Sequence, residues 1–237
     1  MLTVLEFTAP TIAYAKLAPF LIVIGAACLG VLAEAFVARP WRHEVQVGLA
    51  VLAPLAAIVT LIAQWDSPAA LVDESAAAGG AGLTGSILLD GPAKLFWLLL
   101  LGFGLLGLLL FAERAVYGGR GAFTPAAASI PGSKAEAEAA AAGLSHTEVF
   151  PLALFSLSGM LLLTAAGDLL VLFVAVEIVS LPLYVLAALA RHRRLGSQEA
   201  ALKYFLLGVA ASAMLLFGVA LLFAYAGSFD FAAIATA

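Results

Sequence analysis

Glu177 is the residue of this sequence best placed to do chemistry. It lies in an apolar run, Leu169–Ala190, with no other charge between Asp168 and Arg191. At about 1.5 Å of rise per residue, it is about 13 Å from Asp168 and about 21 Å from Arg191, deep in a hydrocarbon layer about 30 Å thick. A carboxylate there costs at least about 2.5 kcal/mol, and such groups generally face a partner, a cavity or an ion path. The position predicts a role in moving protons or ions.

Lys203 carries the opposite charge inside the next apolar stretch. Glu199 precedes it by four residues, the order that favours an ion pair on one helix, and its long stem also lets the ammonium reach the headgroups. The spacing along the chain fits a structural role for Lys203, as an ion pair or a snorkelling side chain. It fits a place on an ion path equally well. In an antiparallel pair of helices Lys203 lies about 8 Å below the nearer membrane surface, and Glu177 lies deeper. We therefore expect coupling through water or a third residue rather than direct contact.

Three polar residues of the Leu169–Ala190 stretch share one helical face, because Glu177, Ser180 and Tyr184 follow the i, i+3, i+7 spacing. Pro182 interrupts the same turn, so we expect a kink and a freed carbonyl at Ile178. A freed carbonyl beside a buried carboxylate can hold the water that a proton route needs. The alternative is that Glu177 hydrogen-bonds across helices and locks their packing. A glutamine would form the same hydrogen bond at a lower free-energy cost of burial, so the presence of a glutamate favours the proton route.

The composition places this chain of 237 residues in a membrane. It is 64% hydrophobic and 11% charged, whereas soluble domains are about 45–50% apolar and about 25% charged. No basic stripe with interleaved aromatic residues is present, so nucleic acid is not an expected partner. The single cysteine, Cys28, is expected to be a small buried thiol.

The distribution of apolar residues predicts an all-α membrane protein, because six stretches are long enough to cross a bilayer as helices. A barrel would need alternating apolar and polar residues, which these stretches lack. The predicted spans are Leu17–Val37, Val47–Trp65, Ala93–Phe111, Phe150–Ala165, Leu169–Ala190 and Ala200–Tyr225.

The connecting segments alternate in charge. Eight of the eleven Lys and Arg residues follow the first, third and fifth spans, while the other connections are acidic. The positive-inside rule assigns the basic connections to the cytoplasm, which predicts a multi-pass protein of the bacterial inner (plasma) membrane with its amino terminus outside. The basic residues are Arg39, Arg42, Arg114, Arg120, Lys134, Arg191, Arg193 and Arg194.

The chain divides into three parts by composition: spans one to three in residues 1–112, a cytoplasmic Ala/Gly-rich connection in 113–147, and spans four to six in 148–237. The connection either holds a short surface helix near Lys134–Ala142 or is a flexible linker.

The first fifteen residues contain no Lys or Arg, which argues against a cleaved signal peptide. Phe229–Ala237 reads as an unfinished amphipathic segment, which indicates a piece of a longer bundle. Glu34 and Lys94, near span ends, are expected to snorkel toward the interface, and His43, His146 and His192 to be solvated in the cytoplasmic connections.

Residues 167–230 resemble a known family, the antiporter-like membrane subunits of bacterial NADH-quinone oxidoreductase, the respiratory complex I. The resemblance is carried by the Asp-Leu-Leu entry at Asp168, by Glu177 with the Ser-Leu-Pro-Leu-Tyr run ending at Tyr184, and by Glu-Ala-Ala-Leu-Lys-Tyr-Phe-Leu-Leu-Gly from Glu199 to Gly208. Residues 1–112 match the family only in hydropathy, and the connection 113–147 is longer than is usual there.

The resemblance implies the first part of a bundle of about fourteen helices with inverted repeats. It implies a proton-translocating subunit of an NADH:quinone oxidoreductase in the respiratory chain, with Glu177 and Lys203 as the proton-transfer residues. The implied partners are the other membrane subunits of that complex and the lipid bilayer. NAD, FMN, iron–sulfur clusters and quinone would be held by partner subunits, with no cofactor and no redox active site in this chain. The lysines of the family's later helices have no counterpart in these residues.

Two other functions stay open. A cation/proton antiporter subunit would share the same glutamate, and a subunit with a purely structural role in a membrane complex would use the buried charges for packing. Replacing Glu177 with glutamine separates the last alternative from transport, because packing tolerates an amide and proton exchange does not.

Overall fold

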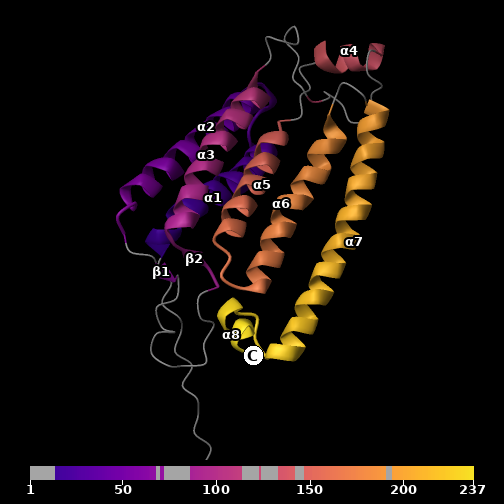
Figure 1. Cartoon of the computed structure of the whole chain (residues 1–237). Helices are drawn as coiled ribbons and strands as arrows, with labels where there is room; N and C mark the ends of the chain where they lie inside the picture. Colours follow the sequence, from indigo (N-terminus) through magenta and orange to yellow (C-terminus); the bar gives the residue numbers. More distant parts are fainter. Residues whose placement is uncertain are drawn as a thin grey trace, which may run out of the picture.

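The computed structural model describes residues 14–67, 70–71, 86–113, 123, 133–141, 147–190 and 194–237. Helices dominate these ranges, as predicted (Figure 1). The apolar helices are α1 (Tyr14–Phe36), α2 (Arg39–Ala63), α3 (Gly91–Ala112), α5 (Val149–Thr164), α6 (Leu169–Leu189) and α7 (Arg194–Ala226), and the short ones are α4 (Lys134–Ala141) and α8 (Phe231–Thr236).

Within the described residues, five of these helices are long and apolar enough to cross a membrane: α1, α2, α3, α6 and α7. The sixth, α5, has 16 residues and reaches only about 24 Å at 1.5 Å per residue. It is nevertheless the centre of the bundle, packed against α1, α2, α3 and α6. Each of the six predicted spans therefore corresponds to one helix of an all-α membrane bundle.

Aspartates determine where three helices begin. Asp90 accepts a hydrogen bond from Ala93 N at 2.8 Å at the start of α3, and Asp168 accepts one from Val171 N at 2.7 Å at the start of α6. Asp230 caps α8 in the same way. Such side chains satisfy backbone N–H groups that a helix leaves unpaired, and their charge complements the helix dipole. Much of the acidic character of these connections is therefore capping.

The capped helix starts lie at one end of the bundle. Two short strands, β1 (Ala70–Leu71) and β2 (Leu88–Leu89), pair antiparallel there. Leu88 N donates to Ala165 O and Gly167 N to Ser86 O, both at 2.8 Å, which ties this segment to the turn between α5 and α6. The connection between α2 and α3 thus has an ordered base in its described residues.

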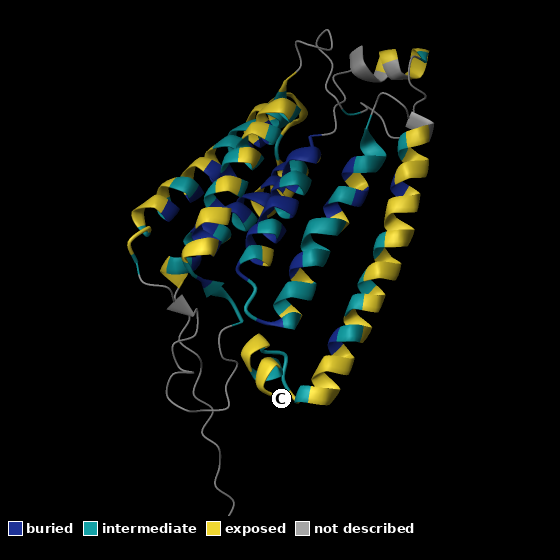
Figure 2. Ribbon diagram, viewed as in Figure 1, coloured by how far each residue is buried: buried dark blue, intermediate teal, exposed yellow. Residues whose placement is uncertain are grey.

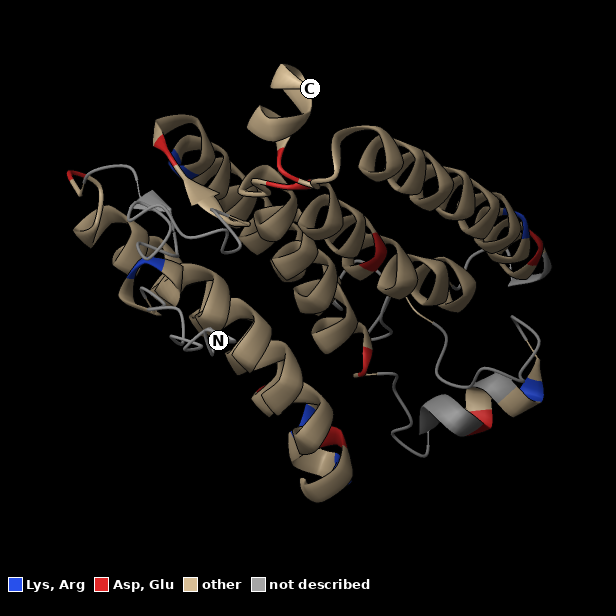
Figure 3. Ribbon diagram, turned by 90° about the horizontal axis from the view of Figure 1, so that it is seen from below, with Lys and Arg blue, Asp and Glu red and all other residues tan. Residues whose placement is uncertain are grey.

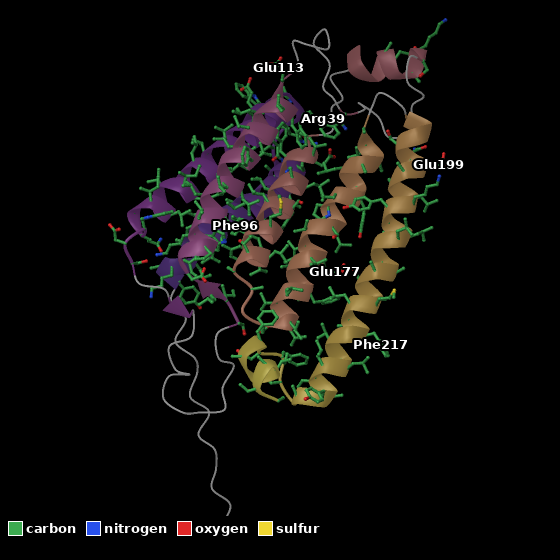
Figure 4. All side chains as sticks on the ribbon, in the orientation of Figure 1. Arg39, Phe96, Glu113, Glu177, Glu199 and Phe217 are labelled. Atoms are coloured by element: carbon green, nitrogen blue, oxygen red, sulfur yellow. The ribbon has the colours of Figure 1, made fainter. Side chains whose placement is uncertain are left out.

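The opposite end of the bundle holds α4 and the beginning of α7 (Figure 1). Arg39, at the start of α2, lies at this end too (Figure 4). Arg114, Arg120, Arg191 and Arg193 lie outside the described residues, so the alternation of charge stays a prediction. Helix α4 also decides between the two interpretations of the 113–147 connection, because residues 134–141 are helical.

The core lies between α1, α2, α3 and α5 (Figure 2). Trp97 of α3 is 1% exposed, and its Nε1 donates to Leu161 O of α5 at 2.7 Å. A buried indole needs such a partner, because an unpaired N–H in an apolar interior costs about 1–3 kcal/mol. Helices α3 and α5, which lie on either side of the 113–147 connection in the chain, therefore share one core.

Two expectations are wrong. Cys28 is exposed rather than buried, because it lies on the outer face of α1 with Leu29 and Leu32. Uniform hydropathy cannot distinguish a face that meets other helices from one that meets lipid. His43 belongs to α2 and not to a connection, and it packs edge to face against Phe150 of α5 with ring centroids 5.9 Å apart. His146 and His192 lie outside the described residues.

Candidate functional site

Glu177 lies midway along α6 (Figure 4). Its Oε1 is buried, and no described residue forms a hydrogen bond with it. A buried carboxyl oxygen without a partner is unusual, because buried polar atoms are nearly always paired with protein or water. The packing interpretation requires a cross-helix hydrogen bond at Glu177, and none exists among the described residues.

Helix α6 meets α5 very closely beside this carboxylate. A Cβ on Gly159 of α5 would lie 2.7 Å from Val179 N and 2.9 Å from the carbonyl carbon of Ile178. Ser156, one turn earlier, donates to Val179 O at 3.2 Å. Small residues that let helix backbones touch are typical of membrane bundles. This contact fixes the height and rotation of α6 next to Glu177.

Helix α6 continues through Pro182 to Leu189. Because proline has no N–H, the carbonyl of Ile178 lacks its usual donor within the helix. Ser180 does not supply one, since its hydroxyl donates to Val176 O at 2.7 Å in its own helix. The predicted kink stays a prediction.

On its other side α6 packs against α7. The stripe of α7 that is buried or half-buried consists of small or aliphatic residues, and its spacing of three and four residues is that of one helix face. Its members are Ala201, Gly208, Ser212, Leu215 and Val219. Tyr184 of α6 is buried against this stripe, with its hydroxyl against the backbone at Gly208.

Lys203 lies off this stripe, near the start of α7. It forms the expected ion pair with Glu199, with Nζ and Oε1 2.5 Å apart, and the two side chains are 68% and 65% exposed. Glu199 lies near the end of α7 that is close to α4 (Figure 4). The structure therefore does not bring Lys203 and Glu177 into contact, which agrees with their different predicted depths.

A second polar cluster lies between α1, α2 and the start of α5, and sequence reasoning missed it. Glu34 Oε1 accepts from Gln46 Nε2 at 2.7 Å and from Thr147 Oγ1 at 2.5 Å, while its Oε2 lies 3.7 Å from Arg42 Nη1. Gln46 is 0% exposed and also donates to Gly30 O at 2.7 Å. Glu34 is thus held in place rather than snorkelling. The sequence feature that could have predicted this cluster is the presence of two polar residues, Glu34 and Gln46, on apolar helices that follow one another in the chain.

Replacing Gln46 with methionine is expected to destabilise the protein by about 1–3 kcal/mol, because the buried Glu34 carboxylate then loses one of its two neutral donors. The change keeps the length of the side chain. The measurement is the thermal midpoint of the purified complex, with Glu44→Gln on the exposed side of α2 as the control. Equal midpoints for the two variants would contradict a stabilising role for the cluster.

Lys94 also has a structural role that differs from the expected snorkelling. It is 4% exposed, and its Nζ donates to Ser67 O at 2.6 Å and to Trp65 O at 3.1 Å, just beyond the end of α2. A lysine at the carboxyl end of a helix satisfies unpaired carbonyls and complements the dipole. The hydrogen bonds to these carbonyls therefore account for a buried charge at Lys94, and no role in transport is needed to explain it.

Elsewhere, charged residues are sparse on the ribbon, and most helical turns carry none (Figure 3). Glu34, Lys94 and the capping aspartates have partners among the described residues, whereas Glu177 does not. Among the described residues, Glu177 is therefore a carboxyl group with a buried oxygen that no neighbouring side chain or backbone group holds.

The comparisons with known proteins first define a class. Residues 166–237, which contain Glu177, Tyr184 and Lys203, match the family described as NADH:quinone oxidoreductase/Mrp antiporter, TM. The chain also superposes on a chain of respiratory complex I from Thermus thermophilus solved with bound aureothin. That match has a TM-score of 0.62 and 28% identity, and covers 90% of this chain and 38% of the other. The fold is that of an antiporter-like membrane subunit, which confirms the predicted resemblance.

The chain is more similar still to one particular subunit. It is 49% identical over 231 residues to NADH-quinone oxidoreductase subunit N of a Nocardioides species, a match that covers 97% of this chain and 43% of the relative. Subunit N of Beutenbergia cavernae is 50% identical over 94% of this chain and 42% of its own length. The similarity thus includes residues 1–112, where sequence reasoning found only matching hydropathy. The chain spans about two fifths of these relatives.

Proposed function

We propose that this chain forms part of a proton-translocating subunit N of an NADH-quinone oxidoreductase. Its relatives over nearly its whole length carry that name, and its helices have the fold of a complex I membrane subunit. Its partners are then the other membrane subunits of the complex, and NADH and quinone are bound elsewhere in that complex.

The observation that carries this proposal is the unpaired oxygen of Glu177 in the middle of α6. A glutamate that served only packing would be hydrogen-bonded, because an unpaired buried polar group costs about 1–3 kcal/mol. A carboxyl group that takes up and releases a proton needs water or a mobile donor at that oxygen.

The mechanism is electrostatic. A carboxylate in a low-dielectric interior interacts with other charges over many ångströms, so protonating Glu177 changes the free energy of charges further along the path. The reduction of quinone in partner subunits supplies the free energy that biases this equilibrium. Lys203, which is paired with Glu199 near the start of α7, is the charge that we propose responds to the protonation of Glu177.

The basic end of the bundle faces the cytoplasm in this proposal, by the positive-inside rule. The start of α1 lies at the opposite end (Figure 1), so in this proposal α1 begins on the outer side of the membrane. Protease accessibility of tags placed at residue 1 and in the 113–147 connection, in sealed vesicles of known orientation, tests this assignment.

A cation/proton antiporter subunit is the second candidate, because the matching family includes Mrp antiporters. Purification of the protein with its natural partners separates the two functions. Co-purification with subunits that oxidise NADH and reduce quinone supports the proposal. Co-purification with an assembly that exchanges cations for protons without a redox reaction supports the alternative.

Replacing Lys203 with alanine is expected to lower proton pumping about fivefold while the amount of assembled complex changes little, because the side chain is exposed in the described residues and removes little packing when lost. The measurement is the initial rate of vesicle acidification divided by the complex present. Lys16→Ala, in the first turn of α1, serves as the control. Equal losses of assembly and pumping would indicate packing instead.

A further inference from the structure

We propose that Tyr184 relays protons on this path. Its hydroxyl lies between the level of Glu177 on α6 and the end of α7 that carries Lys203. The inference rests on the proposed function, because it adds a residue to the same path. Sequence spacing left open how two charges at different depths communicate, and the structure places one hydroxyl between them.

The ring of Tyr184 is fixed by two aromatic neighbours on α7. Its centroid lies 4.6 Å from that of Tyr204, at an interplanar angle of 79°, and 5.6 Å from that of Phe205, at 85°. Edge-to-face pairs of this kind hold a ring in one orientation. Tyr204 directly follows Lys203 in the chain, so one edge of the aromatic cluster lies at the Lys203 level of α7.

The hydroxyl points away from that level. Whereas the ring contacts residues 204 and 205, the hydroxyl end contacts Gly208, where a Cβ would lie only 2.7 Å from Tyr184 Cζ. Helix α7 runs antiparallel to α6 (Figure 1), so moving from residue 204 to residue 208 on α7 is moving toward Glu177 on α6. Long side chains of a helix lean toward its amino terminus, which gives the same direction.

Glu177 and Tyr184 lie on one face of α6, seven residues and about 10.5 Å apart along the axis. Glu177 Oε1 is buried without a hydrogen-bond partner among the residues that the structure describes. In this proposal a short file of water joins the Glu177 carboxyl group to the Tyr184 hydroxyl and forms a hydrogen-bonded chain along this face of α6.

The hydroxyl can pass a proton without changing its own charge. It accepts a proton from a water on one side through an oxygen lone pair as it releases its own proton to a water on the other side. The tyrosine stays neutral, and rotation about its C–O bond restores the starting arrangement. Gly208 positions the hydroxyl for this step, since any larger residue there occupies its place.

Tyr184→Phe tests the hydroxyl alone, since the ring and its aromatic contacts remain. In the assembled complex in native membrane vesicles, we expect NADH oxidation and the amount of complex to be unchanged, the protons moved per NADH to fall about fivefold, and the solvent isotope effect on pumping to change. Tyr204→Phe is the matched control, because that hydroxyl belongs to a half-exposed residue of the same cluster.

Gly208→Ala tests the position of the hydroxyl. The added methyl group must displace the Tyr184 hydroxyl, so the same loss of protons per NADH is expected with the tyrosine still present. Gly218→Ala, on the same helix with nothing within 4 Å of the new Cβ, is the control. Combining Gly208→Ala with Tyr184→Phe should cause no further loss.

The outcomes distinguish this inference from the proposed function. If Glu177→Gln stops pumping while Tyr184→Phe pumps like the unmodified protein, Tyr184 does not relay protons and the proposed function stands. If Glu177→Gln itself pumps normally, the proposed function is wrong. Parallel losses of assembly and pumping in Tyr184→Phe would also overturn the inference, because they indicate a structural role.

Discussion

Replacing Glu177 with glutamine is expected to lower proton pumping by the assembled complex about a hundredfold, the lower end of what one proton-transfer group contributes. The amide has nearly the size and shape of the carboxyl group but cannot exchange a proton. No described residue hydrogen-bonds Oε1, so the substitution breaks no fixed bond there. The amount of complex in the membrane should therefore stay the same.

The test compares three substitutions at one position. Glu177→Asp keeps the acid on a shorter side chain and should retain part of the activity, whereas Glu177→Ala should behave like Glu177→Gln. The measurement is acidification of inverted vesicles on addition of NADH, normalised to the complex present. Pumping at the normal rate by all three variants would show that this carboxyl group does not carry protons.

A second large effect is expected from Gly159→Ala, which should destabilise the bundle by about 1–3 kcal/mol and lower the amount of assembled complex. The new Cβ would lie 2.7 Å from Val179 N and 2.9 Å from the carbonyl carbon of Ile178. These are backbone atoms of α6, so no side chain can rotate away, and the two helices must separate.

The control for this substitution is Gly107→Ala in α3, where nothing lies within 4 Å of the new Cβ. Glycine is about 1 kcal/mol worse than alanine within a helix, so this variant should be neutral or more stable. The readouts are the amount of intact complex on a native gel and its thermal midpoint. Equal behaviour of the two variants would mean that α5 and α6 are not closely packed at Gly159.

The sequence by itself determined that six apolar helices exist and roughly where each lies, although α2 begins at Arg39 rather than Val47 and α7 at Arg194 rather than Ala200. These features follow from local composition, because a bilayer requires continuous apolar helices and a glutamate such as Glu177 within one is conspicuous. The Lys203–Glu199 pair was also predictable, since i, i+4 neighbours on a helix meet whatever surrounds them.

Only the tertiary structure decided which face of each helix meets another helix. Cys28 was misplaced for this reason, since hydropathy is equally high toward lipid and toward protein. His43 was misplaced because α2 begins at Arg39, eight residues before the predicted start of that span at Val47. The buried contacts of Glu34 with Gln46, of Lys94 with the end of α2, and of Tyr184 with Gly208 join different helices. Their partners are distant in the chain, and the rotation and height of each helix, which no local pattern specifies, bring them together.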